Sequence, residues 1–345
     1  MLVLKLNLPS QINRLLHTNQ NNISTIIRRN RTYCCKVLMV GGGTAGIATA
    51  ARLSKLLCKE ELIIVEPEDI HYYQSCFTWI GAGVKKLQES AQVNLKVFPK
   101  NSVWLRDSVA CFSPKNDCVT LESGHVIEYE MMVLAMGVKM DFNKIKGLTM
   151  AWNGCFYFPN TPVKCLTAPL KICYLAQDYL RINDKLCDAD FIFATADSDL
   201  YPIGKYDELL RKIAKRKRID LHFKTNLIEV KPDKRQVILE CLNDSDDKIT
   251  LDYSLLHVTP PMSPPQALQD CNELVDNRGY ADVDLYTLRH NNFDNIFALG
   301  DCSPGDKIRQ LALLACNLRQ FLRALRLRLK EGLPKKYIMV TRPVL

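Results

Sequence analysis

Short apolar runs separated by polar, helix-forming stretches recur along most of the chain. The first run, residues 37–40, leads into a glycine-rich turn and then into helical spacing over residues 47–57. A second apolar run, Leu62–Val65, follows directly. Short buried runs linked by helical segments are typical of strand–helix–strand units in a parallel sheet. The pattern therefore predicts an α/β fold that begins with such a unit.

The segments after this unit are shorter and more mixed. Residues 71–83 are rich in aromatics and glycine and are predicted to form a loop. Residues 93–123 alternate apolar and polar positions around turns, which predicts short antiparallel strands. Residues 131–137 then form an apolar run that ends on Gly137. This run predicts another buried strand of the first region.

A second α/β region is predicted to begin near Cys155. Its expected elements are a strand at Phe191–Thr195, a basic helix over 206–218, a strand over 221–223, and short strands over 226–256 with a polar turn at 243–248. A late apolar run over residues 295–301 suggests a return to the first region. We therefore expect a first domain interrupted by an inserted one. The predicted boundaries are 1–33 for a leader, 34–155, 156–256, 257–330, and a short tail at 331–345.

Charge is distributed unevenly along the chain. The formal net charge is +9, yet no Asp or Glu occurs before Glu60. An acid-free, amphipathic leader that carries arginines is typical of a mitochondrial transit peptide. The alternative is a disordered basic tail. The leader predicts a mitochondrial location, on the inner membrane or in the matrix, and residues 1–33 are left out of the fold prediction.

A second basic segment lies near the end of the chain. Leucines and arginines interleave over residues 318–330, which predicts an amphipathic helix. Such a helix can lie on an anionic membrane, or it can pack on a core with a solvated basic face, and the sequence favours neither. No apolar run approaches the roughly 18 residues of a membrane span, so no transmembrane helix is predicted. No nucleic-acid-binding motif accompanies the charge, so nucleic acid is not an expected partner.

Fourteen cysteines are scattered through the sequence. None forms a CxxC pair, and no Cys/His cluster has zinc-ligand spacing, so no metal site is predicted. In a reducing compartment most cysteines behave as small, buried apolar residues. A catalytic cysteine must therefore be identified by its neighbours.

The turn after the first strand carries a dinucleotide-binding fingerprint. It reads GGGTAG over residues 41–46, and the second strand ends on Glu66. Gly41 permits a tight turn, Gly43 lets a pyrophosphate approach the backbone, and Gly46 lets the helix pack close to the strand. Glu66 is placed to accept hydrogen bonds from a ribose. These four residues are predicted to bind a dinucleotide, and the motif leaves NAD and FAD open.

The corresponding turn of the second region has a different character. It reads ATADSD over residues 194–199, which is acidic and lacks the glycines that a pyrophosphate needs. A second dinucleotide is therefore not expected. An NAD(P)H-dependent disulfide reductase or NADH dehydrogenase is accordingly disfavoured.

The order of the motifs resembles that of flavoproteins with two dinucleotide-binding domains. The fingerprint is followed by a strand ending on Gly137 and by a late strand ending in Gly300-Asp301. In those flavoproteins the mid-chain glycine closes over FAD, and the late aspartate binds its ribityl chain. The resemblance implies FAD as the cofactor, with Gly137 and Asp301 as ligands. The implied fold is an FAD-type Rossmann domain with an inserted, second Rossmann-like domain.

Three further segments are more specific. They are HYYQ with TWIGAG in residues 71–83, FPNTPVKC in residues 158–165, and HVTPPMSPP in residues 257–265. They closely resemble the animal mitochondrial sulfide:quinone oxidoreductase family, over nearly the whole chain after the leader. By this resemblance Gln74, and Lys307 after the late Gly-Asp pair, are expected to lie at the cofactor.

The resemblance implies FAD-dependent oxidation of hydrogen sulfide, with electrons passed to ubiquinone. Cys165 stands where the family has one of two cysteines that receive sulfide sulfur as a persulfide. The neighbouring Lys164 is expected to favour the thiolate. The sulfur would leave to a small acceptor such as glutathione or sulfite, and peripheral contact with the inner membrane is implied.

The sequence also departs from the family pattern. The family's second catalytic cysteine follows a Lys-Lys-Tyr, whereas residues 335–337 are followed here by IMVTRP. The sequence stops at Leu345, whereas the family continues into helices that form the quinone pocket and seat the protein on the inner membrane. Thr167 replaces a glycine, and bulky Ile308 and Arg309 stand where backbone amides approach the flavin. The alternative function is therefore a catalytically impaired or non-enzymatic paralogue that retains the fold, with or without FAD.

Overall fold

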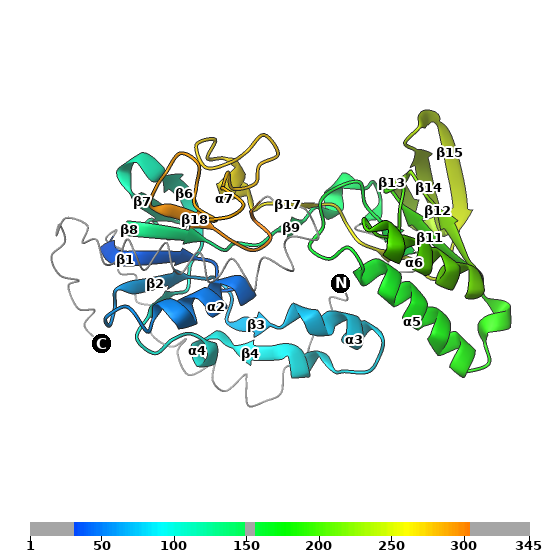
Figure 1. The fold of residues 1–345 in the computed structure, drawn as a ribbon, viewed down its shortest axis with the longest axis horizontal. Helices are drawn as coiled ribbons and strands as arrows, with labels where there is room; N and C mark the ends of the chain where they lie inside the picture. Colours follow the sequence, from blue (N-terminus) through cyan, green and yellow to red (C-terminus); the bar gives the residue numbers. More distant parts are fainter. Residues whose placement is uncertain (1–30, 149–155, 304–345) are drawn as a thin grey trace.

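The computed structural model describes residues 31–148 and 156–303. Figure 1 shows that they form two domains lying end to end. Both domains combine helices with parallel strands, so the predicted α/β class is confirmed. Within these ranges, no helix has the length and apolarity that crossing a bilayer requires.

The first domain is built around a mixed sheet. Its strands, among the described residues, are β1 (Thr32–Val40), β2 (Leu62–Val65), β5 (Val103–Leu105), β6 (Val109–Ser113), β7 (Cys118–Leu121), β8 (Val126–Leu134) and β18 (Ile296–Ala298). The order is β5-β2-β1-β8-β7-β6, and β18 pairs with the second half of β8. Strands β5, β2, β1, β8 and β18 pair in parallel, whereas β7 is antiparallel to both its neighbours. The late strand thus returns to the first sheet.

Strands β1 and β2 lie at the centre because their apolar runs are buried on both faces. Residues 37–40 are 0–3% exposed and Leu62–Val65 are 0–2% exposed. Parallel strands that are covered on both faces need such continuous apolar runs. Strand β1 begins at Thr32, so the sheet includes Thr32 and Tyr33, which the sequence assigned to the leader.

Short helices and a small strand pair surround this sheet. They are α2 (Thr44–Leu53), α3 (Phe77–Gly81), α4 (Asn94–Val97), α7 (Gln266–Gln269), and the antiparallel pair β3 (Ile70–Tyr72) and β4 (Ala91–Val93). Helix α2 buries Ala50 and Leu53 in the core that β1 and β2 share. The loop predicted over residues 71–83 is wrong in part, because α3 lies within it.

The second domain has a parallel sheet of its own. Its strands are β10 (Phe156–Phe158), β11 (Phe191–Thr195), β12 (Ile219–His222) and β16 (His257–Val258), in the order β12-β11-β10-β16. Helices α5 (Ala168–Ile182) and α6 (Gly204–Arg216) form the crossovers between β10, β11 and β12. They cover one face of the sheet, where Cys173 and Ala214 share a core with Phe156 and Phe193.

An antiparallel sheet covers the other face. It consists of β13 (Thr225–Lys231), β14 (Gln236–Cys241) and β15 (Asp244–Asp252). Tyr157 and Ala194 point to this side and share a core with Leu227 and Leu239. The polar turn predicted at residues 243–248 is wrong in its extent. The turn covers residues 242–243, and β15 begins at Asp244 and pairs with β14.

Two passages of the chain join the domains. The chain leaves the first domain through β9 (Lys139–Met140) and returns through β17 (Met262–Ser263), and Figure 1 shows this antiparallel pair between the two domains. Strand β16, at residues 257–258, pairs with β10 of the second sheet. The boundary predicted at residue 257 therefore falls too early, because these residues belong with the second domain.

Candidate functional site

The predicted cofactor residues gather where three parallel strands of the first sheet end. The amide of Ala135 donates to the carbonyl of Val40 at 2.8 Å, and the amide of Leu299 donates to the carbonyl of Leu134 at 2.9 Å. These bonds extend the pairing of β1, β8 and β18 past the strand ends. The turns that follow the strands therefore lie side by side at the carboxyl edge of the sheet, where open α/β sheets bind ligands.

The glycine turn after β1 has the conformation that its sequence requires. Gly41 adopts a φ of +106°, which favours glycine, and a Cβ there would collide with the carbonyl oxygen of Ala135. A Cβ on Gly46 would collide with the carbonyl oxygen of Gly41. These two glycines are therefore fixed by the tight turn and by the close approach of α2 to β1.

Gly43 differs from the other two glycines of the motif. No atom of the described residues lies within 4 Å of the place its Cβ would take, so within this part of the chain this side of the turn is open. Gly43 is also the N-cap of α2 and provides no side-chain cap. The first N–H groups of a helix have no partner within it and carry partial positive charge. The open surface at Gly43 is thus suited to an anionic pyrophosphate.

Glu66, which directly follows β2, lies against this turn. Its carboxylate accepts hydrogen bonds from the amide of Gly42 at 2.6 Å and from the amide of Glu68 at 3.0 Å. Burial raises the pKa of this carboxyl, and the two amides oppose the shift. Each carboxylate oxygen can accept more than one hydrogen bond. Glu66 therefore holds the glycine turn and retains acceptor capacity for a ribose hydroxyl.

The last strand brings Asp301 to the same edge. Gly300 adopts a φ of +78° next to the first turn of α2, where its Cβ would lie 3.1 Å from the Cβ of Ala45. Asp301 follows and is half-buried. Burial raises the pKa of its carboxyl, while the charge of Lys164 acts in the opposite direction. Gly137, at a φ of +68° after β8, has no atom from residues 31–148 or 156–303 within 4 Å of the place a Cβ would take.

Lys164 links the two domains at this edge. It lies between β10 and α5 of the second domain, and its ammonium donates a hydrogen bond to the side-chain oxygen of Gln74 in the first domain. Burial lowers the pKa of Lys164, whereas the nearby carboxylate of Asp301 raises it. An ammonium that is partly withdrawn from water is stabilised by such partners. Gln74, Lys164 and Asp301 therefore form one electrostatic cluster across the domain junction.

Cys165 follows Lys164 in this cluster and is exposed. Other thiols near the predicted cofactor residues have different surroundings. Cys302 is buried, with its Sγ 3.6 Å from the carbonyl oxygens of both Leu134 and Leu299, as a small core residue would be. Cys76 lies two residues after Gln74 and is half-buried. Cys165 is thus the thiol that the cluster exposes to solvent.

Two of the predicted features lie in parts of the chain that the structure does not describe. Lys307 and the segment after Tyr337 lie outside the described residues.

The contact of Lys164 with Gln74 was not predicted, because the sequence assigned Lys164 only to the neighbouring thiol. No signal in either local motif points to this pairing. Across residues 31–148 and 156–303, no group of three His, Cys, Asp or Glu side chains is arranged to hold a metal ion.

Lys164→Met is expected to lower the free energy of unfolding by about 1–2 kcal/mol at neutral pH, because Asp301 loses a nearby cation. Without Lys164, the pKa of Asp301 rises further above its value in the unfolded chain. In the unfolded chain the pKa of an Asp is about 4. Below that pH Asp301 is protonated in both states, so the loss of unfolding free energy caused by Lys164→Met is small. The loss grows as the pH rises through the folded-state pKa of Asp301. Urea unfolding at several pH values measures this trend.

Lys164→Arg is the matched control, because it keeps the positive charge and the donor. It should show a much weaker pH dependence than Lys164→Met. An equal loss of stability at every pH for Lys164→Met would mean that the side chain acts through packing and not through Asp301.

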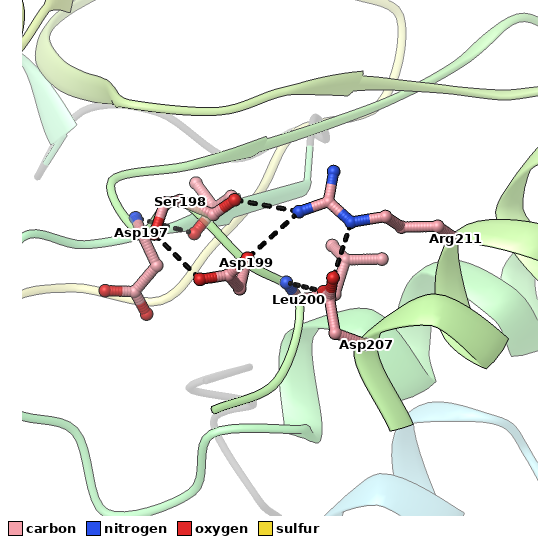
Figure 2. A network of polar contacts seen from close by, with 7 residues as sticks. Asp197, Ser198, Asp199, Leu200, Asp207 and Arg211 are labelled. Atoms are coloured by element: carbon pink, nitrogen blue, oxygen red, sulfur yellow. Dashed lines mark hydrogen bonds and ion pairs between the residues drawn. The ribbon is translucent and has the colours of Figure 1, made fainter. Parts of the chain in front are cut away.

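The turn after β11 stands where a second dinucleotide would bind, and its polar groups are already paired. Figure 2 shows Arg211 of α6 directed at this turn. Its guanidinium pairs with Asp207 at 2.6 Å and with Asp199 at 3.3 Å, and it donates to the carbonyl of Ser198 at 2.8 Å. The amide of Leu200 donates to Asp207 at 2.6 Å. The cation and the amide that a phosphate would need are therefore bonded to protein oxygens.

A cavity of about 180 Å³ lies beside this turn, at the ends of β10 and β11. Its lining includes Phe158, Phe193, Asp197 and Asp199. Pockets that enclose drug-sized ligands usually start at about 300 Å³, so this cavity is small for a dinucleotide. The acidic lining would also repel a pyrophosphate. These features give a physical reason to expect no second dinucleotide here.

Comparison with known proteins identifies relatives, although no protein-family model matches the chain. The chain is 36% identical over 338 residues to the mitochondrial sulfide:quinone oxidoreductase of Mus musculus, covering 88% of this chain and 75% of that protein. It is 32% identical over 308 residues to the protein of the same name from Dictyostelium discoideum, covering 80% and 67%. The chain belongs to the sulfide:quinone oxidoreductase family.

Solved structures share the fold of this sulfide:quinone oxidoreductase family member at lower identity. The enzyme from Aquifex aeolicus matches with a TM-score of 0.73 and 18% identity, covering 85% of this chain and 77% of that one. A chain in the mitochondrial ATP synthase structure of Tetrahymena thermophila matches with a TM-score of 0.71 and 21% identity, covering 87% and 82%. At these identities the likeness shows the fold alone.

Family membership settles several predictions at a coarse level. The protein is an oxidoreductase, as its family is. The predicted mitochondrial location is confirmed by the mitochondrial relatives. The individual site residues remain predictions.

Proposed function

We propose that this family member oxidises hydrogen sulfide with FAD and passes the electrons to a quinone. The cluster at the domain junction carries the proposal. Exposed Cys165 follows Lys164, which bonds to Gln74 and lies close enough to Asp301 for their charges to interact. Sulfide oxidation needs a thiol that is open to dissolved HS⁻ and near an electron acceptor. The cluster joins the proposed sulfur carrier to the proposed flavin ligand.

FAD, as opposed to NAD, fits the first glycine turn and its surroundings. The open surface at Gly43 accommodates a pyrophosphate, and Asp301 supplies an acceptor for a polyol chain at the adjacent strand end. The residues that would hold FAD are Gly41, Gly43, Gly46, Glu66, Gln74, Gly137, Asp301 and Lys307. Bound FAD would supply the two-electron acceptor that sulfide oxidation requires.

Cys165 would carry the sulfur. When its thiolate joins HS⁻, one S–S bond forms, and one proton and two electrons leave. The resulting persulfide can transfer its outer sulfur to a small nucleophile, which regenerates the Cys165 thiolate. By family resemblance, glutathione and sulfite are the first acceptors to test. Lys164 holds the segment that carries Cys165 against Gln74 of the first domain.

Mixing the purified protein with sulfide, and then with a short-chain quinone, tests the proposal. Flavin absorbance should bleach with sulfide and return with quinone. Bound flavin that sulfide does not bleach would contradict the sulfide step, and bleached flavin that quinone does not reoxidise would contradict the acceptor. Protein that purifies without flavin would contradict the FAD assignment, and Ile308 and Arg309 would then be the first residues to replace.

A second candidate function is that of a non-enzymatic or catalytically impaired paralogue that retains the fold and the FAD site. The segment after Tyr337 favours it, because the family has its second catalytic cysteine there and this sequence reads IMVTRP. Such a protein would bind flavin without being bleached by sulfide. The same mixing experiment therefore separates the two functions.

A further inference from the structure

Helix α6 packs one face on the second domain and presents the other to solvent. Asp207 and Ala214 are buried on its inner side. The outer side carries a series of exposed basic residues, Lys205, Lys212, Lys215, Arg216 and, just after the helix, Arg218. Within the helix the one exposed acid is Glu208, which pairs with Lys212. The outer face of α6 therefore has an excess of positive charge.

The two basic side chains on the inner side, Arg211 and Lys217, bond to neighbouring side chains of the domain and are not part of the outer basic face. Arg211 pairs with Asp207 at 2.6 Å, as Figure 2 shows, and Lys217 donates to the side chain of Gln177 on α5 at 2.8 Å. The structure thus pairs the basic residues that face the domain. The exposed pair of Lys212 with Glu208 is of the kind that contributes little in water.

Large apolar side chains stand among the outer bases. Leu209 is 54% exposed and Tyr206 is 51% exposed, and Ile203, just before the helix, is 39% exposed. Residues three and four apart are neighbours on a helix, so Leu209 lies beside Lys205, Tyr206 and Lys212. A single exposed leucine needs no explanation, but a helix face that combines bases with several exposed apolar side chains has the composition of an interfacial helix.

We infer that this outer face of α6 docks on an anionic lipid surface. Its basic side chains would contact acidic headgroups, and Leu209, Tyr206 and Ile203 would enter the interfacial layer. Nucleic acid would be attracted by the charge alone and would gain nothing from an exposed leucine. The surface is defined by Ile203, Lys205, Tyr206, Leu209, Lys212 and Arg216. Docking through this surface does not depend on whether sulfide and quinone are the substrates.

Sedimentation of the purified full-length protein with lipid vesicles tests this inference. Vesicles of phosphatidylcholine alone are compared with vesicles that also contain phosphatidylglycerol. We expect binding to the anionic vesicles only. Reversal of Lys205, Lys212 and Arg216 to Glu should lower the partition coefficient by about 100-fold or more, since each base near an anionic surface contributes. Leu209→Ser should lower it by about 10-fold with the charge unchanged.

A matched variant controls for net charge. It reverses three exposed lysines on the side of the domain that carries β13, β14 and β15, namely Lys224, Lys234 and Lys248. This control should bind vesicles as the unaltered protein does, and urea unfolding should show that all variants are folded. An equal loss in the control variant would overturn the inference, because net charge and not the face of α6 would then govern binding.

Two further outcomes would also overturn it. One is failure of the unaltered protein to bind anionic vesicles. The other is loss of binding when Arg319, Arg323 and Arg326 are reversed to Glu, with full binding in the α6 variant. The membrane contact would then lie in the basic C-terminal segment and not on α6.

Discussion

Gly46→Ala is expected to abolish flavin binding and to lower the free energy of unfolding by about 3 kcal/mol. The added methyl group would collide with the carbonyl oxygen of Gly41, so α2 would have to move away from β1. The same movement displaces the N-terminus of α2, which carries the N–H groups proposed to hold the pyrophosphate. Flavin content of the purified protein measures the first effect, and urea unfolding measures the second.

Gly43→Val separates binding from folding at the same turn. The space around Gly43 is open among the described residues and its φ of −69° suits any residue, so only the poorer N-cap should lower the free energy of unfolding, by about 1 kcal/mol or less. Flavin should nevertheless be lost, because the branched side chain occupies the surface proposed for the pyrophosphate. Gly204→Ala, at an equally open position, should retain flavin. Flavin retention by Gly43→Val would contradict the proposed cofactor position.

The central strands of both parallel sheets could be predicted because they are buried on both faces. The apolar run Leu62–Val65 is the observed β2, and the run Phe191–Thr195 is the observed β11. A strand covered on both faces is apolar at nearly every position, so the sequence shows where it begins and ends. The conformation of the glycine turn was also predictable, because it follows from local steric limits at Gly41 and Gly46.

Elements that depend on tertiary contacts were not predictable in the same way. Helix α3 has five residues, and so short a helix is stabilised by packing more than by propensity. Gly81, its last residue, lies against Ile172 of α5 in the other domain. Strand β15 begins with acidic residues that have little preference for strands, and its pairing with β14 determines its structure.

Part of the candidate site was predictable from the sequence, and part of it depends on tertiary contacts. Asp301 and the glycine turn were expected to meet, because parallel strands of one sheet end at one edge. The hydrogen bond between Lys164 and Gln74 joins residues that are 90 positions apart and lie in different domains. It depends on how the two domains meet, and local patterns contain no information on that. The role of Lys164 in linking the domains therefore emerged only from the structure.

Cys165→Ser is expected to slow the bleaching of flavin by sulfide by about 10⁴-fold, the usual scale for loss of a catalytic nucleophile. Serine cannot form the S–S bond that stores the sulfide sulfur, whereas it fills nearly the same volume as cysteine. Because Cys165 is exposed, flavin content and the free energy of unfolding should stay close to those of the unaltered protein. Stopped-flow absorbance of the bound flavin after mixing with sulfide measures the rate.

Two exposed cysteines elsewhere, Cys58 and Cys111, provide matched controls, and their replacement by Ser should leave the bleaching rate unchanged. Alkylation followed by peptide mass analysis should find an added sulfur on Cys165 after sulfide treatment. If Cys165→Ser bleaches as fast as the unaltered protein, sulfide sulfur does not pass through this thiol. If the unaltered protein binds flavin but neither bleaches nor gains sulfur, the site is a flavin-binding surface without sulfide chemistry, and the paralogue function holds.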